Sequence, residues 1–126
     1  MKLTKNFNLK EFICKDGSVP QGLALQNIKT LAENLQILRD YLGKPIVVTS
    51  GYRSIKYNSK LPGASKVSQH LIGRAADIKV AGIPPQEVAK AIEHLIASGK
   101  MKQGGIGAYN TFTHYDIRGT RARWQV

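Results

Sequence analysis

The sequence predicts a single α+β domain over residues 1–126, with two main helices packed against a small, largely antiparallel sheet. Three observations lead to this prediction. Two segments repeat apolar residues at three- and four-residue steps, as helices do, and each follows or precedes a short strand-like segment. Two further short segments flank a turn at Asn110, the pattern of a β-hairpin. A chain of 126 residues is long enough for one hydrophobic core but not for two.

The first helix is predicted over residues 21–42. Its apolar residues recur on one face: Ile28, Leu31, Leu35, Leu38 and Leu42. Gly43 follows, and glycine readily adopts the left-handed conformation that ends a helix. The second helix is predicted over residues 84–99, with Pro85 in its first turn and Gly99 at its end.

Two strands are predicted between the helices. Residues 44–53, "KPIVVTSGYR", are rich in β-branched residues, and residues 75–82 read "AADIKVAG". In the second strand Ile78 and Val80 face one side of the sheet and Asp77 faces the other. Residues 54–74 between the strands form a long polar loop, and long ordered loops often carry function.

The hairpin is predicted over residues 104–119, "GGIGAYNTFTHYDIRG". In its second strand the side chains alternate between the two faces of the sheet. This alternation places four residues on one face: Phe112, His114, Asp116 and Arg118.

The charge is the unusual feature of the composition. The chain has 19 Lys and Arg against 8 Asp and Glu, a formal net charge of +11. Such a field attracts polyanions, whether nucleic acid, anionic lipid or an acidic cell-wall polymer. The basic residues are spread along the chain with a small concentration in "RGTRARW", which argues against a nucleic-acid-binding arm. Cys14 is the single cysteine, so we expect a small buried hydrophobe and no intramolecular disulfide.

Three residues have the character of metal ligands. "SQHLIGRAAD" holds His70 and Asp77 seven residues apart, and His114 lies on the polar face of the hairpin. Two imidazoles and one carboxylate match the three protein ligands of a catalytic zinc site, whose fourth position stays open. Gly73 would allow the chain to turn back between the first two donors. The alternative is an ordinary turn that contains a polar pair.

"SQHLIGRAAD" resembles the S-x-H-x-x-G-x-A-x-D signature of the zinc D-alanyl-D-alanine peptidases. This family includes D,D-carboxypeptidases and phage L-alanyl-D-glutamate endopeptidases, and it shares a metal-site fold with the Hedgehog signalling domain. The resemblance extends to "FNLKEFICKDG", "VTSGYRS" and the hairpin, in the same order along nearly the whole chain. It implies the Hedgehog/D-Ala-D-Ala peptidase-like fold.

The resemblance also implies roles for individual residues. His70, Asp77 and His114 would bind one zinc ion per chain. Arg53 matches the family arginine that binds the substrate and stabilises the oxyanion of the tetrahedral intermediate. Ser68 matches a serine beside the bound peptide, although it would serve equally well as a turn or capping hydroxyl.

The general base is where this chain departs from many relatives. They carry a Glu or Asp three residues before the last histidine ligand, and here that position is Thr111. Asp116, two residues after His114 on the same face, is the nearest carboxylate, and we assign it the base role. Two alternatives are open: Asp116 orients a ligand or pairs with Arg118, or it is itself a ligand and His114 is the acid/base.

The leading functional hypothesis is a zinc metallopeptidase that cuts an amide bond in peptidoglycan stem peptides. It would be a D-Ala-D-Ala carboxypeptidase or an L-Ala-D-Glu endopeptidase, for example a phage endolysin, with the anionic cell envelope as a further partner. A non-catalytic zinc-containing wall-binding module is the alternative, and a basic nucleic-acid-binding protein is a third class that rests on charge alone.

We expect a monomer with no specific nucleic-acid partner and no transmembrane segment. The N-terminus "MKLTKNFNLKEF" lacks the apolar run of a secretion signal. We therefore expect synthesis in the cytoplasm and action on the wall after export or release, in phage lysis or from a virion.

Overall fold

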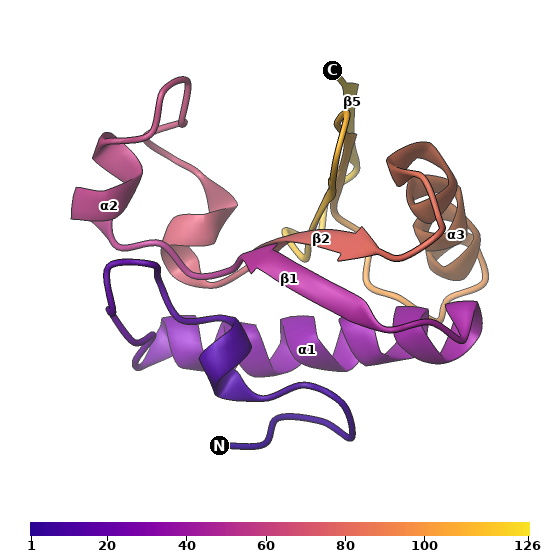
Figure 1. The fold of residues 1–126 in the computed structure, drawn as a ribbon, viewed down its shortest axis with the longest axis horizontal. Coiled ribbons are helices and arrows are strands. Elements are labelled where there is room, and N and C mark those ends of the chain that lie inside the picture. The colour runs from indigo at the N-terminus through magenta and orange to yellow at the C-terminus, as the bar shows by residue number, and fades with distance from the viewer.

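The computed structural model describes residues 1–126 as helices around one five-stranded sheet, with strand order β1-β2-β4-β3-β5 (Figure 1). The elements in chain order are η1 (Leu9–Glu11), α1 (Leu23–Leu42), β1 (Ile46–Ser50), α2 (Ile55–Ser59), η2 (Gln69–Ile72), β2 (Ala75–Val80), α3 (Pro85–Ala97), β3 (Gly105–Ala108), β4 (Thr113–Asp116) and β5 (Ala122–Gln125). The predicted α+β class, with two main helices on a small sheet, is confirmed.

The sheet is largely antiparallel, as predicted. β1 pairs with β2, β2 with β4 and β4 with β3, all antiparallel. The exception is β5, which pairs parallel to β3 at the edge of the sheet. β5 was missing from the sequence prediction: its four residues, "ARWQ", do alternate between apolar and polar, but they lie in the basic segment "RGTRARW", where the sequence indicated only a concentration of positive charge.

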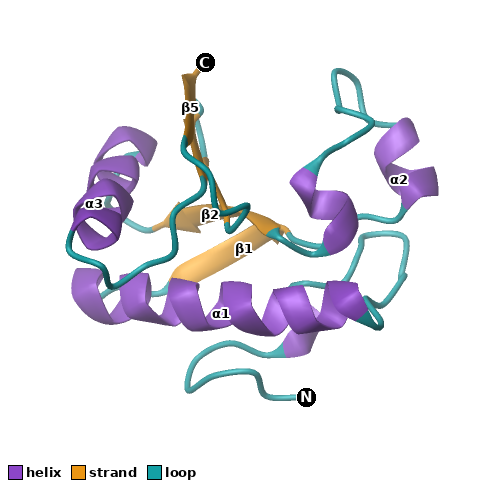
Figure 2. Ribbon diagram, turned by 180° about the vertical axis from the view of Figure 1, so that it is seen from behind, coloured by secondary structure: helices purple, strands orange, loops and turns teal.

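The core lies between the sheet and the two long helices. α1 runs beneath β1 and β2, and α3 stands beside β3 and β4 (Figures 1 and 2). The predicted apolar face of α1 is buried at Ile28, Leu31, Leu35 and Leu38, and Gly43 ends the helix with φ 66°. The N-terminal segment lies along α1, where Thr4 and Asn6 both hydrogen-bond to Gln36. Cys14 is buried and unpaired, as expected.

Residues 54–74 are more ordered than a plain loop. They contain α2, which Ser54 caps by accepting a hydrogen bond from the Tyr57 amide, and the 3₁₀ helix η2. Figure 2 shows this segment rising on one side of the sheet while α3 covers the other. The segment therefore stands beside the central strands, at the place where the candidate ligands gather. No helix is both long and apolar enough to cross a membrane.

Candidate metal centre and active site

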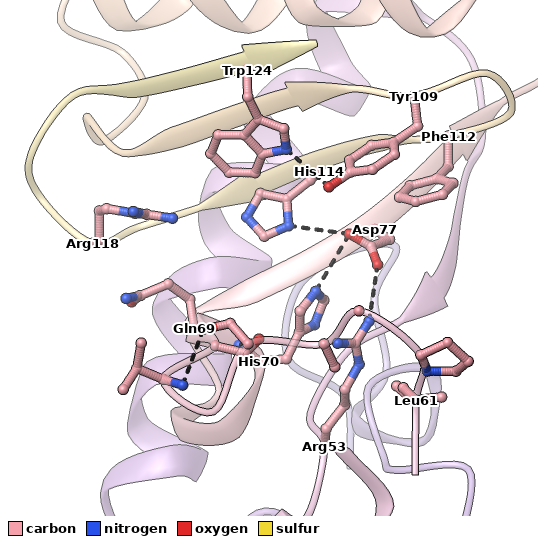
Figure 3. Close-up of a pocket in the computed structure, with 16 residues that line it drawn as sticks. Arg53, Leu61, Gln69, His70, Asp77, Tyr109, Phe112, His114, Arg118 and Trp124 are labelled. Carbon is pink, nitrogen blue, oxygen red and sulfur yellow. Dashed lines mark hydrogen bonds and ion pairs between the residues drawn. The ribbon is translucent and has the colours of Figure 1, made fainter. Parts of the chain in front are cut away.

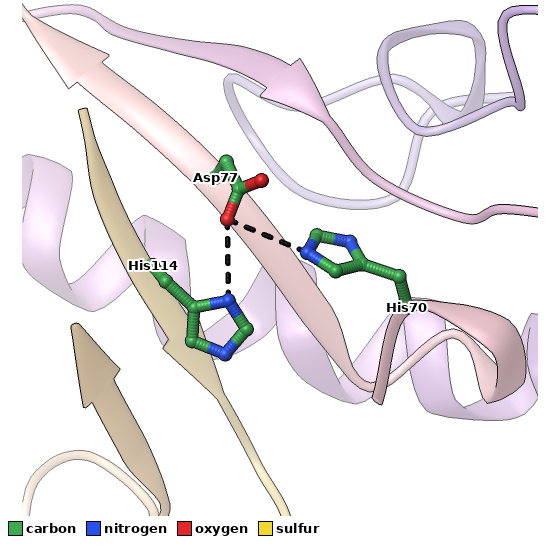
Figure 4. Close-up of side chains that lie close together, drawn as sticks. All are labelled: His70, Asp77 and His114. Carbon is green, nitrogen blue, oxygen red and sulfur yellow. Dashed lines mark hydrogen bonds and ion pairs between the residues drawn. The ribbon is translucent and has the colours of Figure 1, made fainter. Parts of the chain in front are cut away.

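His70, Asp77 and His114 lie together, as the sequence predicted. One ligand atom from each lies within 4.8 Å of the others, and all three side chains are buried (Figure 4). They come from η2, β2 and β4 respectively. The three residues are separated by up to 44 positions in sequence, so the fold and not local sequence brings them together.

The register of the sheet explains how Asp77 meets His114. β2 and β4 are neighbours at the centre of the sheet, and Asp77 lies directly opposite His114. Directly opposed residues project to the same face. His70 reaches this face because the chain turns back at Gly73, which adopts φ 73° and donates its amide to the His70 carbonyl.

The tautomer of His70 is fixed by the backbone. Its Nδ1 lies 2.7 Å from the carbonyl oxygen of Gly51, which can only accept a hydrogen bond. Nδ1 therefore carries the proton, and Nε2 presents a lone pair 3.4 Å from Oδ1 of Asp77. Gly51 must be glycine here because a Cβ would press against the backbone of Phe12, which crosses it.

The tautomer of His114 is fixed in the opposite sense. Its Nε2 lies 2.7 Å from Oδ2 of Asp116 and donates to that carboxylate, so Nδ1 carries the lone pair. Nδ1 lies 3.2 Å from Oδ1 of Asp77. When both imidazoles are neutral, as metal ligands must be, each therefore aims an unprotonated nitrogen at the same carboxylate oxygen. This is the arrangement that histidine metal ligands require.

The electrostatics of the site favour ionised carboxylates. Burial by itself raises the pKa of a carboxyl group, but in the metal-free protein the protonated rings of His114 and His70 donate hydrogen bonds that hold the pKa of Asp77 well below its usual range. Burial also works against charge on Asp116, and hydrogen bonds from His114, Arg118 and the Gly105 amide hold its pKa low as well. Burial lowers the pKa of His114, but its bonds to the two carboxylates outweigh burial and raise it.

The donor set fits a zinc ion. Two imidazole nitrogens with fixed tautomers and one ionised carboxylate converge on one point, and zinc accepts these donors in catalytic sites. In such sites the protein supplies three ligands and leaves a fourth position open. Here the three donors face a cavity, which leaves room for a fourth ligand.

That cavity has a volume of about 640 Å³. The segment between α2 and η2 forms one wall, and the hairpin and β5 form the other (Figure 3). His70, Asp77 and His114 line it together with Arg53, Ser68, Gln69 and Arg118. Aromatic side chains line the hairpin wall: Tyr109, Phe112 and Trp124.

Arg53 lines the cavity and lies beside Asp77. Its Nη2 lies 3.4 Å from Oδ2 of Asp77, its Nη1 donates to Asn58 and its Nε donates to Ser50. The side chain is 15% exposed. The guanidinium is thus held rigidly at the edge of the metal centre, where it can contact a bound ligand.

Ser68 also lines the cavity, but its hydroxyl is engaged. Ser68 Oγ accepts a hydrogen bond from the His70 amide at 3.2 Å and so caps η2. A capping hydroxyl still has its own proton to donate. The geometry therefore allows both roles that the sequence left open.

Asp116 lies outside the cavity in this structure. It is fully buried beneath His114 and does not line the cavity. Its oxygens accept from the amides of Gly105 and Arg118, from the Arg118 guanidinium and from His114. This position corresponds to the alternative in which Asp116 orients a ligand and pairs with Arg118. Thr111 is exposed and lies outside the cavity.

Several residues that build the site were not predicted from the sequence. The glycines of "GGIG" make room for it: a Cβ at Gly105 would overlap the Asp116 carboxylate, and a Cβ at Gly107 would overlap the indole of Trp124. The spacing of these glycines was the available signal, since glycine inside a strand often marks a close approach of another group. Trp124 and Tyr109 had no comparable signal.

The fold and the three converging donors define a metal-binding α+β domain with a ligand cavity. The sequence profile of the Peptidase M15 family matches residues 5–116, and the chain belongs to this family. It is 35% identical over 102 residues to the peptidoglycan L,D-endopeptidase MepK of Escherichia coli (strain K12), covering 75% of this chain and 52% of that protein.

Two other relatives agree with the family match. The chain is 34% identical over 89 residues to a probable peptidoglycan L,D-endopeptidase MepK of Haemophilus influenzae, covering 66% of this chain and 45% of the relative. It is 41% identical over 63 residues to the zinc D-Ala-D-Ala carboxypeptidase of Streptomyces albus G, covering 49% of this chain and 24% of the relative. The chain spans about half the length of the MepK proteins it matches.

Proposed function

We propose that this protein is a zinc-dependent peptidase that hydrolyses an amide bond in peptidoglycan stem peptides. One observation carries the proposal. Two buried histidines, each with its tautomer fixed by a separate acceptor, aim their free nitrogens at one buried aspartate on the floor of a cavity. The names of the relatives support zinc as the metal and peptidoglycan as the substrate.

The relatives suggest two bonds. MepK is named an L,D-endopeptidase and the Streptomyces protein a D-Ala-D-Ala carboxypeptidase. The likeness to MepK extends over 75% of this chain and the likeness to the carboxypeptidase over 49%. We therefore propose an endopeptidase acting within the stem peptide, with removal of a terminal D-Ala as the second activity to test.

Bound at His70, Asp77 and His114, zinc would polarise the scissile carbonyl and lower the pKa of the attacking water. The protein's own contribution begins with orientation: the Gly51 carbonyl and Asp116 each hold one imidazole in its productive tautomer. Arg53 would donate hydrogen bonds to the substrate oxygen that gains negative charge. A fixed donor of this kind lowers a barrier by about 3–4 kcal/mol in other hydrolases.

The test is digestion of purified peptidoglycan by the zinc-loaded protein, followed by mass spectrometry of the muropeptides. Cleavage inside the stem peptide identifies an endopeptidase, and loss of a terminal D-Ala identifies a carboxypeptidase. The His70→Ala variant is the control for contaminating hydrolases. If the zinc-loaded protein releases neither product, the proposal is wrong.

The lack of a second carboxylate in the cavity favours a second candidate function, a non-catalytic wall-binding module. Asp77 is the sole carboxylate among the residues that line the cavity. Thr111 occupies the position at which many relatives carry the general base, and it lies outside the cavity. A non-catalytic zinc-containing module that binds the wall would need no base. It predicts that the zinc-loaded protein cosediments with peptidoglycan and leaves every muropeptide intact.

The net charge of +11 supports a further part of the proposal, attraction to the anionic cell envelope. We propose that the protein meets the wall as a monomer after export or release, as a phage lysis enzyme or a virion-associated enzyme would. Binding to purified walls should then weaken as salt concentration rises. Binding that is insensitive to salt would contradict the electrostatic part.

A further inference from the structure

The hairpin wall of the cavity contains the hydroxyl group of Tyr109, which has no role in the reaction proposed above. Tyr109 follows β3 and lines the cavity together with the three candidate ligands. Its ring stacks on Phe112 with centroids 4.4 Å apart and an interplanar angle of 12°. This stacking restricts the ring, so the position of the hydroxyl is defined by the fold.

Trp124 fixes the hydroxyl further. The indole Nε1–H donates to Tyr109 Oη at 2.9 Å, so the phenol oxygen serves as an acceptor. The O–H proton of Tyr109 has no acceptor in the protein. A hydroxyl can donate and accept at once. Tyr109 thus presents an unused donor to the cavity, as Figure 3 shows beside His114 and Trp124.

The sheet is built to allow this contact. Gly107 of β3 lies opposite His114 on one side and opposite Trp124 on the other. Because Gly107 has no side chain, the indole lies across β3 and packs against the His114 ring, with centroids 4.9 Å apart. A Cβ at this position would overlap the indole nitrogen that binds Tyr109. One glycine therefore permits a connection from the ligand His114 to the Tyr109 hydroxyl.

Arg53 and Tyr109 approach the centre from different walls. Arg53 stands on the side of α2 and η2, and Tyr109 stands on the side of the hairpin, with Asp77 between them in Figure 3. Arg53 is already paired with Asp77, whereas the Tyr109 proton is free. A substrate carbonyl drawn to the three ligands would meet donors on two sides.

We propose that Tyr109 is a second hydrogen-bond donor to the scissile carbonyl oxygen during hydrolysis, and that Trp124 is the residue that positions it. This inference rests on the proposed peptidase function. Addition of water forms a C–O bond and moves the C=O electron pair onto the carbonyl oxygen. Tyr109 donates a hydrogen bond to that oxygen and keeps its proton. The C–N bond then breaks, and the amine leaves with a proton that comes from the water.

The Tyr109→Phe substitution tests the donor, because it removes the hydroxyl and keeps the ring that stacks on Phe112. On the stem peptide that the wild-type enzyme cleaves, kcat should fall on the order of 10²-fold, the effect of losing one such donor. KM should change less than about twofold, because the interaction forms in the transition state. Zinc content should equal that of the wild type. Tyr41→Phe, an exposed tyrosine on α1, is the matched control.

Trp124 offers a readout that does not depend on activity. It is the only tryptophan, so the intrinsic emission of the metal-free protein reports its environment. Tyr109→Phe should shift this emission because the indole N–H loses its acceptor, and Tyr41→Phe should not. Trp124→Phe keeps an aromatic ring on His114 but removes the N–H. Trp124→Phe should also lower kcat, by a smaller factor than Tyr109→Phe.

A phosphinate analogue of the cleaved peptide separates the donor from a merely structural residue. Its tetrahedral oxygens resemble the transition state, so Tyr109→Phe should weaken its binding by the same factor as kcat/KM falls. Any one of three results for Tyr109→Phe would overturn the inference: a wild-type kcat, a raised KM with normal kcat, or an unshifted Trp124 emission. If wild-type protein cleaves no stem peptide, the proposed function fails and the inference fails with it.

Discussion

Nε2 of His114 donates a hydrogen bond to Oδ2 of Asp116 at 2.7 Å, and the carboxylate that accepts it is fully shielded from solvent. Asp116 also binds Arg118 through both of its oxygens. The aspartate therefore holds the imidazole in one tautomer and one orientation. We infer that its role is to prepare His114 as a ligand and not to take a proton from water.

The Asp116→Asn substitution tests this role. It keeps the size of the side chain but removes the charge that supports His114, so zinc affinity should fall about 10–100-fold. Hydrolysis should be largely restored by excess zinc. Competition with a chelator measures the affinity, and turnover is measured at zinc saturation. Normal affinity with turnover reduced by about 10²–10⁴-fold would instead indicate the general base predicted from the sequence.

Removing a ligand should remove the metal. His70→Ala and Asp77→Ala each leave two donors where zinc needs three, so neither variant should retain stoichiometric zinc. Elemental analysis of the purified proteins measures this directly. His94→Ala is the matched control, because His94 is exposed on α3 and far from the three ligands in sequence. Full zinc occupancy in His70→Ala would show that the ion lies elsewhere.

Arg53 should matter for turnover more than for metal binding. Arg53→Ala should retain zinc and lower kcat/KM by roughly 10²-fold or more, the range observed when an oxyanion donor is lost. Arg53→Lys should recover little, because an ammonium group cannot replace the planar fork that reaches Ser50, Asn58 and Asp77. Lys56→Ala removes an exposed positive charge from α2 and controls for the loss of net charge. Near-normal kinetics in both Arg53 variants would make Arg53 structural.

The edge strand β5 should be sensitive to acid. Arg123 of β5 donates to both carboxylate oxygens of Glu93 on α3, at 2.6 and 2.8 Å. The hydrogen bond from Arg123 lowers the pKa of Glu93 below 4.5. A carboxyl with a lowered pKa stabilises the folded state above its unfolded pKa, and this contribution disappears as pH falls through the folded value.

Glu93→Gln should therefore lower the free energy of unfolding at pH 7, and the difference from wild type should shrink below about pH 4.5. Urea unfolding of both proteins at pH 7 and pH 3 measures it. Glu87→Gln is the control, since Glu87 contacts only the exposed Lys90 on the same helix. A difference that stays constant with pH would mean that the ion pair does not stabilise β5.

Much of the fold could be predicted because its signals are local. The apolar face of α1 and the glycine at its end follow from the spacing of residues within one segment. β5 could not be predicted in this way, because its two central residues are stabilised by distant partners: Arg123 by Glu93 and Trp124 by Tyr109. The strand itself does alternate between apolar and polar residues, but an alternation of only four residues in a basic segment is a weak signal.

In the candidate site, too, the residues that belong to local motifs could be predicted and the others could not. His70, Asp77 and His114 belong to recognisable motifs, and the structure brings them together. The burial of Asp116 could not be predicted from the sequence, because strand alternation places Asp116 on the same face as His114 without showing that it lies beneath the ring. Its isolation from the cavity depends on Gly105, which lets the carboxylate pack against the backbone of β3.

The pairing of Asp77 with His114 joins two strands whose ligand residues are 37 positions apart. A zinc ion held there would act as a cross-link through the centre of the sheet, and it would form only in the folded chain. Thermodynamic linkage then makes zinc availability a determinant of folding: a free concentration 100 times the dissociation constant adds about 2.7 kcal/mol to stability. Catalytic competence and resistance to proteolysis would decline together under zinc starvation.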